Sequence, residues 1–301
     1  MRLDLPPVYA SPRVETVQTW DGGDPRVELI AVETEEDFWL PAYVMEPRGR
    51  HEGRTLIALH GQGRGALDVV GPHLRPGAGQ DLSEAASYGG VWAKAGFVVV
   101  VPELRGFGRL MLSDDRDSLD RPAEPPSSRN SASRLMAIYL QLGRTYAGCC
   151  VADLIRLIDH LESRQGVDAD RIGIGGIGEG ARVLSWLVAL EDRIIASSAW
   201  IPARDESPTR AENGLESPPM IGTLGLVDPV SMLACYVPKP LYLQAGRPET
   251  VGGAGRGRSA VDRLGRLYRL CGAEDRFVLD TEDGAPRLDH DKIVEFFGQW
   301  L

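Results

Sequence analysis

The sequence predicts an α/β protein built on a mostly parallel, doubly wound sheet that is flanked by helices. Short apolar runs recur along the chain, and each has the length of a strand that is buried on both faces. Helical patterns separate these runs, and such alternation is typical of a parallel sheet. The 301 residues suit one large domain spanning 1–301. The runs are TLIAL at 55–59, FVVVV at 97–101, RIGIG at 171–175, IIASSAW at 194–200 and LYLQ at 241–244.

The N-terminal region has a different pattern. Residues 1–25 are rich in proline and glycine, and we expect them to wrap the surface. Residues 27–33 and 40–45 alternate in polarity, which predicts two antiparallel strands joined by an acidic turn. Residues 48–54 are expected to form the loop before the first buried strand.

Helices are predicted between and after the buried strands. Gly96 suits the end of the first helix, because glycine readily adopts the backbone conformation that stops a helix. The stretches 104–146 and 202–232 are long for simple connections, so we interpret them as insertions or lid segments. The predicted helices are 83–95, 148–163, 179–190, 259–271 and 288–301. One further strand is predicted at 276–279.

Composition restricts the partners of the chain. Its formal net charge is −10, which argues against nucleic acid and anionic membranes, since both require basic patches. The N-terminus lacks a signal-peptide pattern, and no apolar run approaches the roughly 18 residues that span a bilayer. We therefore expect a cytoplasmic protein. Trp200, at the end of a buried strand, separately suggests a small hydrophobic or aromatic molecule as partner, because flat ligands bind at this edge of such sheets and stack on indole rings. Whether it is a monomer or a homodimer stays open.

Cysteine usage indicates neither a metal site nor a disulfide. The four cysteines show no metal-ligand spacing, and we expect no metal and no cofactor. Cys149 and Cys150 are adjacent in a predicted helix, where their side chains lie on different faces, so we do not expect a bridge between them.

One glycine-rich segment carries the strongest functional signal. RIGIGGIGEG at 171–180 has the pattern of a strand, a tight turn and the start of a helix. Gly176 and Gly180 flank the turn as glycines flank the serine of a G-x-S-x-G nucleophile elbow. The middle position is Gly178, which has no side chain that could attack a substrate. The segment therefore predicts a hydrolase scaffold that has lost its nucleophile.

From about residue 40 to the end, the order of motifs resembles the α/β-hydrolase fold, and more narrowly its dienelactone hydrolase and acetylxylan esterase-like branch. The resemblance is carried by LIALHGQGRGALDVVG, AGFVVVVPELRGFGR, LGRTYAGCCVADLIRLIDHLE, GVDADRIGIGGIGEGARVLSWLVALEDRI, VPKPLYLQAGRPE and DGAPRLDHDKIVEFFGQWL. It implies that the catalytic serine position is Gly178, the acid position Glu249 and the histidine position Pro286. His290 follows four residues later and is a candidate substitute base, although this spacing differs from that of the resembled family. Without serine and histidine, the acyl-enzyme route has no chemical start.

The resemblance also implies which groups remain at the site. The backbone amides of Glu179 and Gln62 would form an oxyanion hole. Glu179 is also the leading candidate acid or base; alternatively, its carboxylate only favours the dipole of the helix that it begins. Glu249 would bind a cation or a ligand hydroxyl, or would simply pair with an arginine.

Other residues are candidates to line the site, and most have a plainer alternative. His60 is alternatively a structural histidine bonded to backbone, Arg64 a solvated loop arginine and Trp200 a packing residue of the core. Glu103 and Arg105, in the motif PELRGFG, are expected to support loops. The candidate lining residues are His60, Arg64, Tyr88 and Trp200.

These features favour a cofactor-independent, non-hydrolytic enzyme that stabilises an enolate or phenolate in the oxyanion hole. Its reaction would be carbon–carbon bond formation, cyclisation or rearrangement. The resemblance suggests a natural-product pathway, with an aromatic polyketide or an anthraquinone-fused enediyne intermediate as substrate. Two alternatives stay open. One is a ligand-binding pseudoenzyme. The other is an esterase or other hydrolase with a relocated nucleophile, or with direct water attack promoted by His290 or Glu179.

Overall fold

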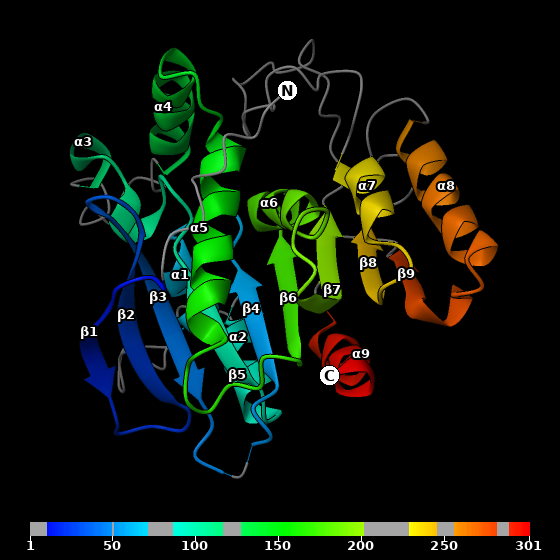
Figure 1. Cartoon of the computed structure of the whole chain (residues 1–301), viewed down its shortest axis with the longest axis horizontal. Coiled ribbons are helices and arrows are strands. Elements are labelled where there is room, and N and C mark those ends of the chain that lie inside the picture. The colour runs from blue at the N-terminus through cyan, green and yellow to red at the C-terminus, as the bar shows by residue number, and fades with distance from the viewer. Residues whose placement is uncertain are drawn as a thin grey trace.

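The computed structural model describes residues 11–49, 51–71, 87–116, 128–201, 229–245, 256–281 and 289–301. In this part of the chain the strands form one sheet with helices on both faces (Figure 1). The strands are β1 Val14–Trp20, β2 Arg26–Glu35, β3 Phe38–Glu46, β4 Thr55–Leu59, β5 Val98–Pro102, β6 Ile172–Ile177, β7 Ile194–Ile201, β8 Leu241–Ala245 and β9 Phe277–Thr281.

The order of the strands is that of a doubly wound sheet. Among the described residues it runs β1-β2-β3-β5-β4-β6-β7-β8-β9. Strands β4 to β9 pair in parallel, whereas β1, β2 and β3 pair antiparallel with one another and β3 pairs antiparallel with β5. The mostly parallel sheet predicted from the sequence is therefore confirmed.

Residues 14–20 lie at the surface, as expected, but they form the edge strand β1, which was not predicted. This strand pairs antiparallel with β2 and is largely exposed, as expected for an edge strand that carries mostly polar side chains. Proline and glycine lie only on either side of this short segment, so the composition of the whole region hid the strand.

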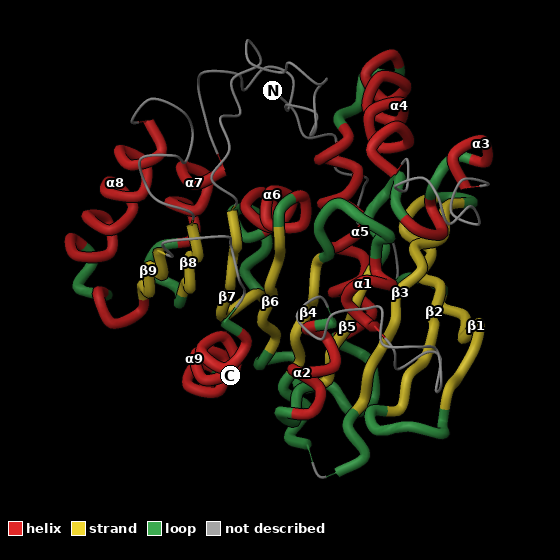
Figure 2. The backbone as a smooth tube through the Cα atoms, turned by 180° about the vertical axis from the view of Figure 1, so that it is seen from behind, coloured by secondary structure: helices red, strands yellow, loops and turns green. Residues whose placement is uncertain are grey.

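The helices cover both faces of the sheet, as views from the two sides show (Figures 1 and 2). Helices α1, α2 and α9 contribute to the core on one face, and α5 to α8 contribute to the core on the other. The helices are α1 Ala66–Val70, α2 Tyr88–Lys94, α3 Ser113–Arg116, α4 Ser128–Gln141, α5 Tyr146–Leu161, α6 Glu179–Leu187, α7 Pro229–Met232, α8 Arg256–Leu270 and α9 His290–Trp300, with short 3₁₀ turns η2 Gly108–Leu110, η4 Leu233–Tyr236 and η5 Glu274–Arg276.

The predicted helices correspond to α2, α5, α6, α8 and α9, with ends that differ by a few residues. Helix α1 and the helices inside 104–146 were not predicted. Helix α4 begins SRNSAS, and serine and asparagine favour turns over helix interiors, which masked it in the sequence. Most of the predicted lid 202–232 lies outside the described residues, and its last four residues form α7.

Glycines in the central strand β6 let bulky side chains pack against it. A Cβ atom on Gly175 would lie 2.4 Å from Cη2 of Trp92, and one on Gly173 would lie 3.1 Å from Cε1 of Phe297. The Trp92 and Phe297 rings meet edge to face, with centroids 5.7 Å apart. Helices α2 and α9 therefore pack closely on the strand that leads into the elbow.

The remaining general predictions concern cysteines and membranes. All four cysteines are free, so Cys149 and Cys150 do not form a bridge, as predicted. Within the described segments, no helix combines the length and apolar character that crossing a bilayer requires.

Candidate functional site

The site is built around the turn between β6 and α6. Strand β6 ends at Ile177, α6 begins at Glu179, and Gly178 between them has φ 55° and ψ −111°. This left-handed conformation is readily adopted by glycine. The Gly178 amide donates to the Trp200 carbonyl at 3.0 Å, and the Gly178 carbonyl accepts from the Arg182 amide at 3.1 Å. The turn is thus fixed from the neighbouring strand and from the helix.

The flanking glycines are required by close backbone packing. A Cβ atom on Gly180 would lie 2.5 Å from the Leu59 carbonyl oxygen, and one on Gly176 would lie 2.8 Å from the Ala181 nitrogen. At Gly178, by contrast, a Cβ atom would have only the Cα of Gly61 within 4 Å among the described residues, at 3.9 Å. The elbow therefore has room for the beginning of a side chain that the chain does not carry.

Glu179 combines burial with an unsatisfied carboxylate oxygen. Its side chain is 6% exposed, and its enclosed Oε2 has no hydrogen-bond partner among the described residues. Burial, with smaller contributions from the charges of Cys150 and Glu179, holds the pKa of Tyr146 well above its ordinary value. A buried polar atom without a partner is costly and calls for a functional explanation. The Glu179 amide belongs to the first turn of α6, where a helix has no internal acceptor.

His60 is a structural histidine in this geometry. Its Nδ1 lies 2.8 Å from the Gly61 carbonyl oxygen, and its Nε2 accepts from the Leu104 amide at 3.0 Å. These bonds define a neutral ring that carries its proton on Nδ1, and burial lowers the pKa of His60 to about 4. Both ring nitrogens are engaged with backbone, so the structural alternative describes His60 better than a ligand-binding role.

The loop after β4 passes beside the elbow. The Gly180 amide donates to the His60 carbonyl at 3.1 Å, and Gly61 is the residue nearest to a Cβ atom at position 178. Gln62 follows directly, so its amide belongs to the loop that flanks the first turn of α6. This arrangement is compatible with the predicted oxyanion hole.

Arg64 is engaged by a neighbour. Its Nε donates to Oδ1 of Asp68 at 2.8 Å, and its amide donates to Oδ2 of the same carboxylate at 2.8 Å. The side chain of Arg64 is 41% exposed. The structure therefore describes a loop arginine paired with α1.

Tyr88, His290 and Trp200 lie around the same edge of the sheet. The Tyr88 hydroxyl donates to the Leu59 carbonyl at 2.7 Å, so this group is used by the fold. The ring of His290, at the start of α9, stacks on the Tyr88 ring with centroids 6.2 Å apart. Trp200 is partly exposed at the end of β7 and holds Gly178 through its carbonyl. The structure thus places His290 against Tyr88, near the end of β4. Glu249 and Pro286 lie outside the described residues.

Sequence reasoning assigned Glu103 only to the scaffold, but the structure gives it a more specific position. Its side chain is fully buried, and it accepts hydrogen bonds from the amides of Ala66, at 2.7 Å, and Arg109, at 3.3 Å. Burial raises the pKa of Glu103 to about 7. The available signal was a carboxylate directly after an all-apolar strand, where a charged side chain is unexpected.

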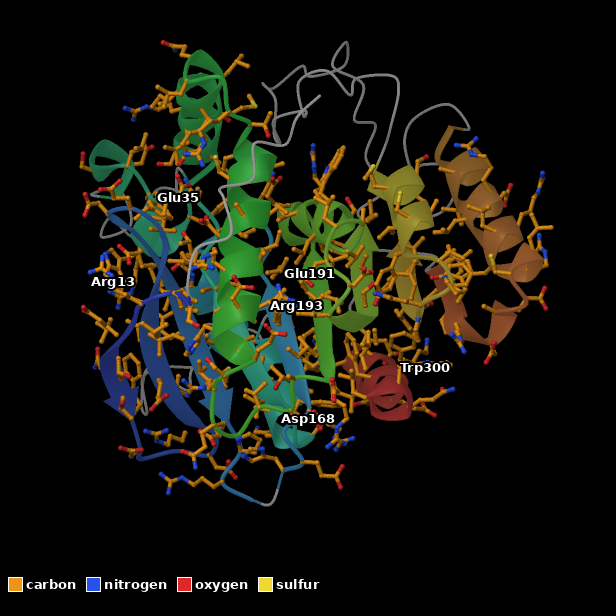
Figure 3. All side chains as sticks on the ribbon, in the orientation of Figure 1. Arg13, Glu35, Asp168, Glu191, Arg193 and Trp300 are labelled. Carbon is orange, nitrogen blue, oxygen red and sulfur yellow. The ribbon has the colours of Figure 1, made fainter. Side chains whose placement is uncertain are left out.

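Arg105 fulfils the predicted supporting role. Its guanidinium donates to both oxygens of Asp153, at 2.6 and 2.7 Å, and to the Tyr139 hydroxyl at 2.9 Å. It also bonds Glu35, which is labelled in Figure 3. This network joins the loop after β5 to α4, α5 and the last residue of β2. In the part of the chain that the structure describes, no group of three or more His, Cys, Asp or Glu side chains is arranged to hold a metal ion.

Comparison with known proteins adds one relative by sequence. No family model matches the chain. The "Putative hydrolase YtaP" of Bacillus subtilis is 27% identical over 183 residues, which cover 60% of this chain and 54% of that protein. The match therefore spans about half the length of the relative.

Solved structures show the fold more fully. A "putative acetyl xylan esterase" from Bacteroides fragilis has a TM-score of 0.69 at 15% identity, covering 96% of this chain and 77% of the other. A glucuronoyl esterase from Solibacter usitatus has a TM-score of 0.63 at 13% identity, covering 97% and 87%. A "Putative Dienelactone Hydrolase" from Klebsiella pneumoniae has a TM-score of 0.53 at 17% identity, covering 87% and 94%. The chain has the α/β-hydrolase fold, and these structural neighbours are named as esterases and hydrolases.

Proposed function

We propose that this protein is an enzyme that binds an oxygen-bearing group of a small molecule at the β6–α6 elbow and transforms it without an acyl-serine intermediate. The supporting observation is the elbow itself. Gly178 has the backbone conformation and the space of a nucleophile position but carries no side chain. A fold that keeps the turn can still use its amides for charge stabilisation, although it cannot form a covalent bond there.

The proposed chemistry uses two kinds of group. The amides of Glu179 and Gln62 stabilise negative charge on a substrate oxygen, with help from the dipole of α6. The carboxylate of Glu179 takes a proton from the carbon beside a carbonyl, and the electron pair moves onto the carbonyl oxygen as an enolate. The enolate carbon then forms a new bond with an electrophilic carbon of the substrate. The proton on Glu179 passes to the group that accepts the displaced electron pair, so that charge and protons balance.

The most specific form of the proposal names carbon–carbon bond formation, cyclisation or rearrangement of a natural-product intermediate. An aromatic polyketide or an anthraquinone-fused enediyne is the substrate class suggested by the sequence resemblance. The partly exposed Trp200 beside the elbow supports a flat aromatic ligand, because such ligands stack on indole rings.

Ester hydrolysis is the second candidate, and the names of the relative and of the structural neighbours favour it. Here water attacks the ester carbonyl directly, with Glu179 or His290 as base, or a nucleophile elsewhere in the chain replaces the elbow serine. A panel of acetyl and methyl esters tests this candidate. Hydrolysis by the wild-type protein that is lost in Glu179→Gln or His290→Ala would favour it over the enolate chemistry.

The proposed anion site is tested by titrating the protein with 4-nitrophenolate, whose absorbance reports binding of its oxygen. We expect saturable binding by the wild-type protein. We expect the affinity of Glu179→Gln to be roughly threefold higher or more, because the variant removes a like charge from the site. Binding of the phenolate without turnover of any carbonyl substrate would indicate that the protein is a ligand-binding pseudoenzyme.

The matched control is Glu191→Gln. Glu191 is also a buried glutamate, at 7% exposed, but it follows the C-terminal end of α6 and pairs with Arg193; both side chains are labelled in Figure 3. Its replacement should leave the phenolate affinity unchanged. Failure of all three proteins to bind the phenolate, or equal affinity in all three, would contradict the anion site.

A further inference from the structure

We propose that Glu103 is a positioning residue for this site: its carboxylate fastens the loop at 60–66, which carries Gln62, to the loop at 103–109. The inference rests on the proposed function, in which the Gln62 amide stabilises negative charge on a substrate oxygen. The fastening itself can be measured independently of any reaction.

The carboxylate bridges the two loops directly. Glu103 follows β5, and its own amide donates to the Pro41 carbonyl at 2.9 Å, which fixes its backbone to β3. Oε1 accepts from the Ala66 amide at 2.7 Å and Oε2 accepts from the Arg109 amide at 3.3 Å. Each oxygen therefore holds a different loop, and the side chain is fully buried between them.

Two glycines make room for this carboxylate. A Cβ atom on Gly65 would lie 1.9 Å from Oε1 of Glu103, and one on Gly108 would lie 2.4 Å from the same carboxyl group. Both glycines have positive φ, 73° and 45°, a conformation that glycine adopts readily. The Glu103 carboxylate occupies the position that a side chain on either glycine would take. The two loops thus share a cradle that fits a carboxylate and excludes any larger residue at either position.

Contacts lead from Glu103 to the elbow. His60 Nε2 lies 3.8 Å from Oε1 of Glu103, and the His60 carbonyl accepts the Gly180 amide in the first turn of α6. The Cα of Gly61 would lie 3.9 Å from a Cβ atom at position 178, and Gln62 is the next residue. Glu103 therefore bonds this loop at one place, and the first turn of α6 bonds it at another. A change in its two bonds would shift the Gln62 amide relative to that of Glu179.

The groups that face Glu103 make its charge sensitive to pH. Arg109 contributes a positive charge and Asp68 a negative one, His60 is neutral in its bonded form, and Tyr43 lies within electrostatic range. Burial outweighs the two amide bonds and raises the pKa of Glu103 to about 7. An ionised carboxylate accepts both amides, whereas a protonated one turns one of its oxygens into a donor. One loop is then held less firmly, so the fastening loosens as the pH falls below neutrality.

The first readout is the amide signals of Ala66 and Arg109 by nuclear magnetic resonance from about pH 5 to about pH 9. We expect both signals to titrate together with a midpoint near 7 in the wild-type protein. Glu103→Gln, which mimics the protonated group, should abolish the titration, and the control Glu191→Gln should keep it. Signals that do not titrate in the wild-type protein, or that titrate equally in Glu103→Gln, would overturn the inference.

The second readout is the affinity for 4-nitrophenolate, expressed per ionised probe. We expect the wild-type affinity to fall roughly threefold or more from about pH 9 to about pH 6, and the affinity of Glu103→Gln to be low and flat. A wild-type protein and a Glu103→Gln variant with equal affinities at both ends would overturn the positioning role. If no variant binds the phenolate, the proposed function fails, and the amide titration alone decides whether the fastening exists.

Glu103→Asp is the second variant, for use if Glu103→Gln does not fold. It keeps the charge and shortens the reach by one methylene, so one oxygen should lose its amide. We expect one of the two signals to titrate and the other to become insensitive to pH. Full titration of both signals would contradict the bridging geometry.

Discussion

Position 178 shows what a single missing side chain can and cannot change. Its backbone keeps the left-handed conformation, its carbonyl and amide keep their bonds, and the described residues leave the space beside it open. What is absent is the atom that would attack a carbonyl. The neighbouring Glu179 contributes an amide at the start of a helix and a carboxylate oxygen with no partner among the described residues. We therefore propose that the turn stabilises charge and that Glu179 transfers the proton.

The elbow glycines differ in their expected tolerance of alanine. Gly178→Ala should lower the free energy of unfolding by about 1 kcal/mol, because its φ is positive and no described residue crowds a Cβ atom there. Gly180→Ala should lower it by about 3 kcal/mol or more, because the Cβ atom would meet the Leu59 carbonyl at 2.5 Å and backbone yields little. Urea unfolding of both variants measures the difference. A Gly178→Ala variant as unstable as Gly180→Ala would refute the open space at the elbow.

Among the elements, those with one dominant local signal could be predicted from the sequence. The buried parallel strands are continuous apolar runs, and β6 with α6 is marked by its glycine spacing. Strand β1 and helix α4 were missed because their local composition favours coil, and packing against the rest of the chain decides their structure. Helix α1 is only five residues long, which is too short to show a helical period.

The site was predictable only where chemistry is encoded locally. Gly178 and Glu179 follow from one motif, whereas Glu103 bonds an amide 37 residues away, and no local pattern shows such a contact. The structural roles of His60 and Tyr88 likewise depend on carbonyls and amides that the fold brings together. Composition can suggest such residues, but it cannot show which distant backbone groups their side chains bond.

Across the whole molecule, the sheet has a hydrophobic core on each face. Two buried titratable groups, Glu103 and His60, make the stability of the protein depend on pH. Glu103 has a folded pKa of about 7, above its ordinary value of 4.5, so between these values the folded state holds a proton that the unfolded state has lost. Its contribution to stability is therefore full below about pH 4.5 and declines as the pH rises through 7. His60 acts in the opposite sense, because its folded pKa of about 4 lies below 6.5, so its contribution is present above 6.5 and is lost as the pH falls through 4.

These opposed slopes predict the pH dependence of the free energy of unfolding. In the wild-type protein they should largely cancel between about pH 5 and about pH 6.5. Glu103→Gln removes the falling slope, worth up to about 3 kcal/mol, so the stability of this variant should rise with pH over that range. Urea unfolding at several pH values checks this difference. Parallel pH profiles for the two proteins would show that Glu103 titrates alike in the folded and unfolded states. The charge on Glu103 is thus costly to the whole fold even though it strengthens two bonds in the loops.

A covalent probe of activated serines distinguishes a protein that works without an acyl-serine intermediate from a serine hydrolase. The wild-type protein is treated with a fluorophosphonate that labels activated serines, and its intact mass is recorded. We expect an unchanged mass, since the elbow carries Gly178 and the proposed reaction uses no other side chain as a nucleophile. A stoichiometric adduct would identify a reactive serine elsewhere in the chain and would contradict the account in favour of a hydrolase with a relocated nucleophile.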